Sequence, residues 1–222
     1  MNEWKALGKQ TLRAIIGLFI CGAGLYLTLQ ANVGVGPWET LNVGLSRQMP
    51  ISYGTASVAT ALVIVLIDLV MHERIGLGTL LDAVLVGKFV DLLDWMDLVP
   101  QCQRFLPGVA VLFGGMVLVS IGQWLYMSAG LGCGPRDSFL VGVGRRMARL
   151  PIGVVNFIIF IVVTALGFAL HGDVGVGTLL FAVFQSAIMQ LVFRIARFEP
   201  RNVIHEDVVQ TVRRLRRKEQ TL

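Results

Sequence analysis

Long runs without charge constrain this chain more than any other feature of its sequence. A helix that crosses a bilayer needs about 20 predominantly apolar residues. Of the 222 residues, 55% are hydrophobic and 15% are charged, whereas soluble domains carry about 25% charged residues. The sequence therefore predicts an integral membrane protein and argues against a soluble domain or a disordered chain. Five runs of at least twenty residues lack Asp, Glu, Lys and Arg: 14–38, 48–67, 105–135, 150–172 and 174–193.

A sixth apolar segment, roughly 76–96, is interrupted by four charged residues. It is too apolar for a soluble loop, so we expect a sixth span with a polar face. The predicted fold class is an all-α membrane protein with six transmembrane helices. The interrupting residues are Asp82, Lys88, Asp91 and Asp94.

The positions of Lys and Arg predict the orientation. If the N-terminus is inside, most basic residues fall in cytoplasmic segments, and the outer segments hold only Arg47 and Arg104. Cytoplasmic loops carry an excess of Lys and Arg, so we expect both termini in the cytoplasm of a bacterial inner membrane. The basic tail from residue 194 predicts a helix lying on anionic lipid headgroups; a solvated or disordered tail is the alternative. No recognition fold accompanies it, so no nucleic-acid partner is expected.

The chain contains an internal repeat. Residues 26–49 match 124–147 at nine of 24 positions, with a spacing of 98. Residues 75–84 match 174–183 at seven of ten positions, with a spacing of 99. Two blocks in the same order and at nearly the same spacing indicate a duplication. The predicted division is an N-terminal segment 1–13, repeat one 14–98, an outer linker 99–107, repeat two 108–197 and the tail 198–222.

Each repeat holds three predicted spans. Three is an odd number, so the repeats enter the membrane from opposite sides and form an inverted-topology pair. Many secondary transporters are built this way, with the substrate site between the repeats near the bilayer midplane.

A repeated Gly-x-Gly-Pro motif predicts a helix break in each half. Glycine permits positive φ, and proline ends one helix but suits the first turn of the next. We expect short helices from Pro37 through Met49 and from Pro135 through Met147. At 1.5 Å per residue they are too short to cross a core of about 30 Å, so each repeat has a broken or re-entrant element. The motif residues are Gly34, Gly36, Pro37, Gly132, Gly134 and Pro135.

Two interpretations of these short helices stay open. They can line a cavity and present polar residues to a solute, since irregular backbone is tolerated there. Alternatively, they are interfacial helices whose glycine, proline and acid cap a turn. The candidate side chains are Trp38, Glu39, Arg136 and Asp137.

A second repeated motif, Gly-x-Gly-Thr, opens the third helix of each half. Close helix packing is the favoured interpretation of Thr79 and Thr178, and a polar lining is the alternative. Asp82 and Lys88 lie inside the predicted third span, where ionisable residues usually face a cavity or a partner. Gln185 is the polar candidate in the sixth span. A structural pair between Lys88 and Asp91 would explain the same pattern.

Other chemistry is sparse. Asp68 is expected near the membrane interface, at the end of the second span. The three cysteines have no metal-type spacing, and the histidines form no ligand cluster. No hydrolase, zinc-protease or nucleotide motif is present, so we expect neither an enzyme nor a cofactor or metal. The cysteines are Cys21, Cys102 and Cys133.

The duplicated motifs resemble those of the YczE/YitT family of bacterial membrane proteins. The residues that carry the resemblance are Gly34 to Glu39, Gly76 to Thr79, Gly132 to Asp137 and Gly175 to Thr178. The resemblance implies five or six helices in the plasma membrane and no particular substrate. The expected function is a small-solute transporter or permease. The alternatives are a membrane accessory protein that stabilises a partner complex, or a substrate-binding subunit of a larger importer. A homodimer is possible.

Overall fold

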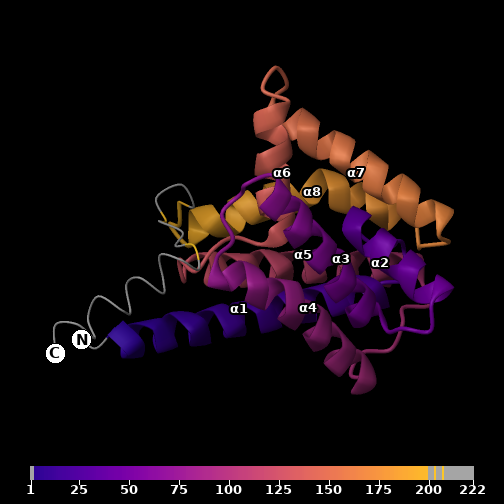
Figure 1. Cartoon of the computed structure of the whole chain (residues 1–222). Helices are drawn as coiled ribbons and strands as arrows, with labels where there is room; N and C mark the ends of the chain where they lie inside the picture. Colours follow the sequence, from indigo (N-terminus) through magenta and orange to yellow (C-terminus); the bar gives the residue numbers. More distant parts are fainter. Residues whose placement is uncertain (1–2, 200–202, 204–206, 208–222) are drawn as a thin grey trace.

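The computed structural model describes residues 3–199, 203 and 207, and every helix or strand it assigns there is an α-helix. Of the predicted lipid-binding tail, only residues 194–199, 203 and 207 are described. Figure 1 shows α1 as a long rod beside the other helices, with α7 along one edge of the molecule. The helices are α1 Glu3–Gln30, α2 Pro37–Gln48, α3 Tyr53–Val70, α4 Leu77–Trp95, α5 Phe105–Met127, α6 Pro135–Arg146, α7 Ile152–Ala169 and α8 Val176–Ile195.

Five helices are long and apolar enough to cross a membrane: α1, α3, α5, α7 and α8. The segment expected to form a sixth span is the 19-residue helix α4, which carries the four charges named above. The described residues are therefore all-helical where they form regular structure, with at least five candidate membrane spans. α1 begins at Glu3, so most of the predicted N-terminal segment continues the first helix.

The two short helices occur where the Gly-x-Gly-Pro motifs predict them. α2 and α6 both begin at the motif proline and have twelve residues each. The first motif glycine has positive φ in both halves, 99° at Gly34 and 121° at Gly132. A side chain is strained in that region, which explains why glycine stands at both positions.

The helices of the two halves correspond one to one. Tyr53 at the start of α3 and Ile152 at the start of α7 are 99 residues apart, as are the starts of α4 and α8. His72 and His171, also 99 residues apart, both have positive φ. The packing is exchanged between the halves, because α2 packs on α7 and α6 packs on α3. This exchange places the short helix of each half against the other half.

The most extensive contact between described helices is that of α1 with α5, and it is made through glycines. A Cβ on Gly24 would lie 2.7 Å from the carbonyl oxygen of Gly115. A Cβ on Gly17 would lie 2.8 Å from the carbonyl oxygen of Gly122. Small residues allow backbones to approach closely in membrane proteins, so these four glycines fix the α1–α5 helix pair.

The Gly-x-Gly-Thr motif of each half binds the broken loop of the other half. The Gly78 N–H donates to the Leu131 carbonyl at 2.6 Å, and the Gly177 N–H donates to the Val33 carbonyl at 2.7 Å. The Thr79 hydroxyl also donates to the Cys133 carbonyl at 2.6 Å. The motif therefore satisfies backbone groups that the helix break leaves open.

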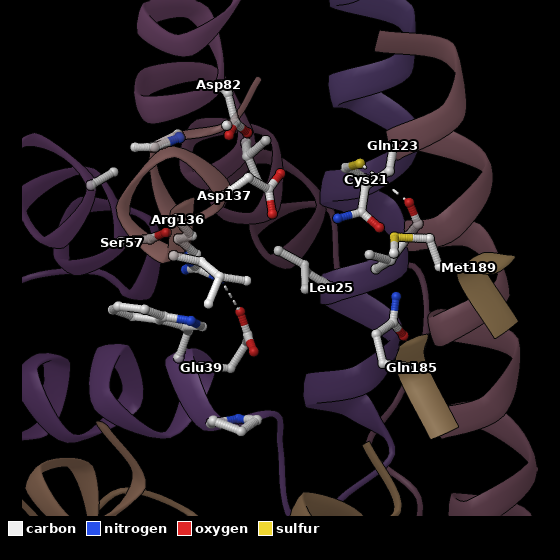
Figure 2. A pocket seen from close by; sticks show the side chains of 18 of the residues that line it. Cys21, Leu25, Glu39, Ser57, Asp82, Gln123, Arg136, Asp137, Gln185 and Met189 are labelled. Carbon is white, nitrogen blue, oxygen red and sulfur yellow. Dashed lines mark hydrogen bonds and ion pairs between the residues drawn. The ribbon is translucent and has the colours of Figure 1, made fainter. Parts of the chain in front are cut away.

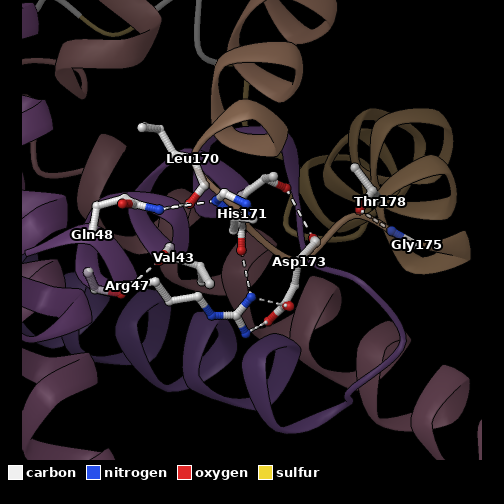
Figure 3. Close-up of polar contacts among 10 residues, drawn as sticks. Val43, Arg47, Gln48, Leu170, His171, Asp173, Gly175 and Thr178 are labelled. Atoms are coloured by element: carbon white, nitrogen blue, oxygen red, sulfur yellow. Dashed lines mark hydrogen bonds and ion pairs between the residues drawn. The ribbon is translucent and has the colours of Figure 1, made fainter.

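The far end of each short helix is tied to the other half by arginine. At the end of α2, Arg47 lies 2.8 Å from the Asp173 carboxylate and donates to the His171 carbonyl at 2.7 Å (Figure 3). In the equivalent place on α6, Arg145 lies 3.0 Å from the Glu73 carboxylate. Arg146 donates to the Met71 carbonyl at 3.1 Å. We call these two sets of contacts the α2 latch and the α6 latch.

Candidate functional site

A cavity of about 260 Å³ lies where the two halves meet, and all eight helices contribute to its wall. The N-terminal turns of α2 and α6 both reach it, through Pro37 and Pro135 and the residues that follow them. The helix breaks therefore place the first turns of both short helices on one cavity (Figure 2).

Residues at equivalent positions of the repeat face this cavity. Glu39 and Asp137, which are 98 residues apart, both line it, as do their neighbours Trp38 and Arg136. Further along the chain the lining pairs are 99 residues apart: Ser57 with Asn156, Ala61 with Phe160, and Val86 with Gln185. The cavity therefore follows the internal repeat of the chain.

An ion pair between the two halves forms one wall. Arg136 donates to the Glu39 carboxylate at 2.7 Å. The Glu39 side chain is 2% exposed, and the Arg136 side chain is 28% exposed. The Arg136 guanidinium also lies 5.3 Å from the centre of a Trp38 ring, a favourable cation–π distance. The charge of Glu39 is therefore balanced by Arg136, which occupies the position of the second half that corresponds to Trp38 in the first.

Two further carboxylates lie on the same side of the cavity. Asp137 accepts a hydrogen bond from the Tyr126 hydroxyl at 3.4 Å, and that hydroxyl accepts one from the Gly134 N–H at 2.7 Å. The Asp82 carboxylate lies against Gly134. Figure 2 shows Asp82 and Asp137 beside each other above the Glu39–Arg136 pair. Three carboxylates face one guanidinium, so the lining has excess negative charge when all four groups are ionised.

The opposite wall carries two glutamines. The Gln185 amide nitrogen donates to the Ser120 hydroxyl at 3.3 Å. Within the described residues, the amide oxygens of Gln123 and Gln185 are buried and have no hydrogen-bond partner. Buried polar groups are normally paired, so these two oxygens are free to accept hydrogen bonds from a molecule in the cavity.

The structure brings together six of the nine predicted site residues. Thr79 and Thr178 lie outside the cavity lining, at the loops described above. Lys88 also lies outside it; its side chain is 54% exposed and lies 3.9 Å from Asp91. The six that line the cavity are Trp38, Glu39, Asp82, Arg136, Asp137 and Gln185.

Sequence reasoning missed several polar residues of the cavity lining, among them Tyr126 and Gln123. Tyr126 and Gln123 lie in the charge-free run that predicted a span, and nothing in that run marks its inward face. Asp68, expected near the membrane interface, lies two residues before the end of α3, and its side chain is fully buried. Neither of its carboxylate oxygens has a hydrogen-bond partner among the described residues. The equivalent residue, 99 positions later, is Gly167, which packs directly on α2. A glycine at the equivalent position could have indicated that Asp68 lies at a close helix contact and is buried.

The described residues contain no group of three His, Cys, Asp or Glu side chains arranged to hold a metal. The cavity lining presents the carboxylates of Glu39, Asp82 and Asp137 and the amide groups of Gln123 and Gln185. Carboxylates and amide oxygens all accept hydrogen bonds.

Comparison with known proteins assigns the chain to a family. A family of unknown function, DUF6198, matches residues 8–194. The chain belongs to this family. It is 28% identical over 176 residues to the uncharacterized membrane protein YczE of Bacillus subtilis, covering 78% of this chain and 80% of that one. The resemblance to YczE-like membrane proteins is thereby confirmed, and the chain is an integral membrane protein.

The alignments with two further relatives cover most of the length of each relative. An uncharacterized protein of Haemophilus influenzae is 33% identical over 192 residues, covering 86% of this chain and 87% of that one. The uncharacterized protein YyaS of Bacillus subtilis is 26% identical over 170 residues, covering 74% and 83%. No solved structure matches the chain.

Proposed function

We propose that this protein is a transporter or permease for a small cationic solute, and that the cavity is its binding site. The observation that carries the proposal is the lining itself. Three carboxylates face one guanidinium, and two amide oxygens lack donors. Charges inside a membrane protein usually mark a substrate or ion pathway. A cation with N–H donors satisfies both sets of groups.

The proposed mechanism is a rocking of one repeat against the other. It rests on six spans, with α4 as the sixth, arranged as two inverted repeats in a bacterial inner membrane with both termini cytoplasmic. In that arrangement the α2 latch and the α6 latch lie on opposite faces of the membrane. Exposed ion pairs contribute about 0–1 kcal/mol, which suits the α2 latch, where both side chains are 49% exposed, as a contact that opens and closes in every cycle.

Uptake into proteoliposomes tests the proposal. A panel of small ammonium solutes, with matched neutral and anionic compounds, is presented to protein reconstituted alone. We expect saturable uptake of at least one cation and its loss in Asp82→Asn. Gln103→Ala, in the segment before α5, serves as a control and should transport normally. Absence of binding and uptake for every solute would overturn the proposal. Binding without uptake would favour a binding subunit of a larger importer.

A further inference from the structure

The helix pairs that flank the cavity in the two halves are joined very differently. α3 packs along α4, and a Cβ on Gly54 would collide with the backbone of Gly87. Asp91 of α4 accepts hydrogen bonds from the Ser52 hydroxyl at 2.6 Å and from the Gly54 N–H at 2.7 Å. The Lys88 ammonium lies 3.4 Å from the Thr55 hydroxyl. We call this set of contacts the α3–α4 seam.

The corresponding seam is absent between α7 and α8, which make no comparable contact along their described lengths. The residue equivalent to Gly54 is Gly153, and among the described residues no atom beyond its own stretch of helix lies within 4 Å of a Cβ built on it. The residue equivalent to Asp91 is Gln190, which is exposed. The residue equivalent to Gly87 is Ser186, which is also exposed. Of these seam residues, Gly54 is therefore retained as a glycine in the second half, whereas Gly87 and Asp91 are replaced by Ser186 and Gln190.

The cavity reaches the outside of the helix bundle at this place. Asn156 and Phe160 of α7 line it together with Gln185, Ser186 and Met189 of α8. Ser186 is both exposed and part of the lining. Large exposed apolar side chains surround this opening, and such a surface faces lipid tails in a membrane protein. They include Phe157 and Ile161 on α7, and Val183 and Leu191 on α8.

We propose that the cavity opens sideways into the bilayer between α7 and α8, and that its ligand is an amphipathic ammonium compound. Its N–H donors bind between the carboxylates of Asp82 and Asp137 and the amide oxygens of Gln123 and Gln185. Its apolar chain leaves through the opening beside Ser186, into the lipid. This proposal rests on the proposed function in taking the cavity as a binding site, and it names the class of ligand.

Equilibrium binding of radiolabelled octylammonium and butylammonium provides the test. The full chain is placed in phosphatidylcholine nanodiscs, and binding to empty nanodiscs is subtracted. We expect octylammonium to bind at least tenfold more tightly than butylammonium. Ser186→Trp fills the opening and should weaken octylammonium binding at least tenfold, with little effect on butylammonium. Ala187→Trp places the same ring one residue away, outside the cavity lining, and is the matched control.

The outcomes separate the two proposals. If both amines bind equally and Ser186→Trp changes neither, the lateral opening is wrong and the cation site stands. If neither amine binds, or if octylammonium binding is unchanged in Asp82→Asn, the ligand class proposed here is wrong, and solute uptake alone decides the proposed function.

A labelling experiment covers the case in which Ser186→Trp fails to fold. In a chain with Cys21, Cys102 and Cys133 replaced by alanine, a bilayer-soluble alkyl maleimide should label Ser186→Cys. Octylammonium should protect that cysteine from labelling at least threefold. Labelling without protection would contradict the lateral opening.

Discussion

At the scale of single residues, the cavity depends on how its few charges are paired. Glu39 and Arg136 come from different halves, and Glu39 is almost completely buried. Removing one member of a buried ion pair leaves a desolvated charge, which costs about 3–5 kcal/mol. Replacing both members removes that penalty. The pair therefore joins the two halves, and replacing only one of its two residues is expected to destabilise the protein.

We predict that Glu39→Gln lowers the free energy of unfolding in detergent by about 3 kcal/mol, the lower end of the range for buried pairs. The double variant Glu39→Gln with Arg136→Gln should recover part of this loss. Denaturant titration followed by circular dichroism measures both. Arg47→Gln, which breaks an exposed pair, is the control and should cost no more than about 1 kcal/mol. Additive losses in the double variant would show that the two side chains do not interact.

Asp68 presents the opposite situation, because its buried carboxylate has no hydrogen-bond partner among the described residues. An unpaired buried charge destabilises a folded protein. We therefore predict that Asp68→Asn raises the melting temperature of the purified protein. Asp91→Asn removes an acceptor of two hydrogen bonds and should lower it. A lower melting temperature for Asp68→Asn would indicate that a bound cation partners Asp68 in the folded protein.

At the scale of elements, the sequence predicts backbone geometry well and partners poorly. The start of both short helices follows from the Gly-x-Gly-Pro motif, because proline and glycine act through local φ restrictions. The interlocking of Thr79 with the loop at Cys133 could not be predicted. It joins positions 54 residues apart through a carbonyl oxygen, and every residue of the chain carries one. Lys88 illustrates the same limit, since a charge in an apolar segment does not show which face it occupies.

The seam between α3 and α4 gives an element-scale prediction with a built-in control. Gly54→Ala should destabilise the protein, because the added methyl group collides with the backbone of Gly87. Gly153→Ala occupies the equivalent position of α7, where the described part of the chain places no atom of another element within 4 Å of the added methyl group. It should be neutral, or stabilising by up to about 1 kcal/mol, because alanine favours helix over glycine. Melting temperatures in detergent measure both. Equal effects of the two variants would contradict the difference between the seams.

At the scale of the whole molecule, the repeat explains why two distant ends of the structure are built alike. The α2 latch and the α6 latch use arginines 98 residues apart, Arg47 and Arg145. The acidic partner is not repeated at the same spacing, since Asp173 and Glu73 are 100 residues apart. Both halves have therefore kept an ion pair between arginine and a carboxylate, but the acidic residue differs in type and in position between them. Comparing the motifs alone would not have paired these residues.

If the repeats are inverted, opening either latch should expose the cavity to a different side of the membrane. Ser57, which is buried and lines the cavity, reports this as Ser57→Cys in a chain without its native cysteines. We predict that Arg47→Ala increases labelling by a membrane-impermeant maleimide from the outer face, and that Arg145→Ala increases it from the cytoplasmic face. Right-side-out and inside-out vesicles separate the two.

Exchanging the charges, as in Arg47→Asp with Asp173→Arg, should restore the low labelling of the unmodified latch. That result would exclude a general loosening of the fold as the cause. If both single variants increase labelling from the same face, the two latches lie on one side of the membrane. The repeats would then not be inverted, and rocking between them could not carry a solute across.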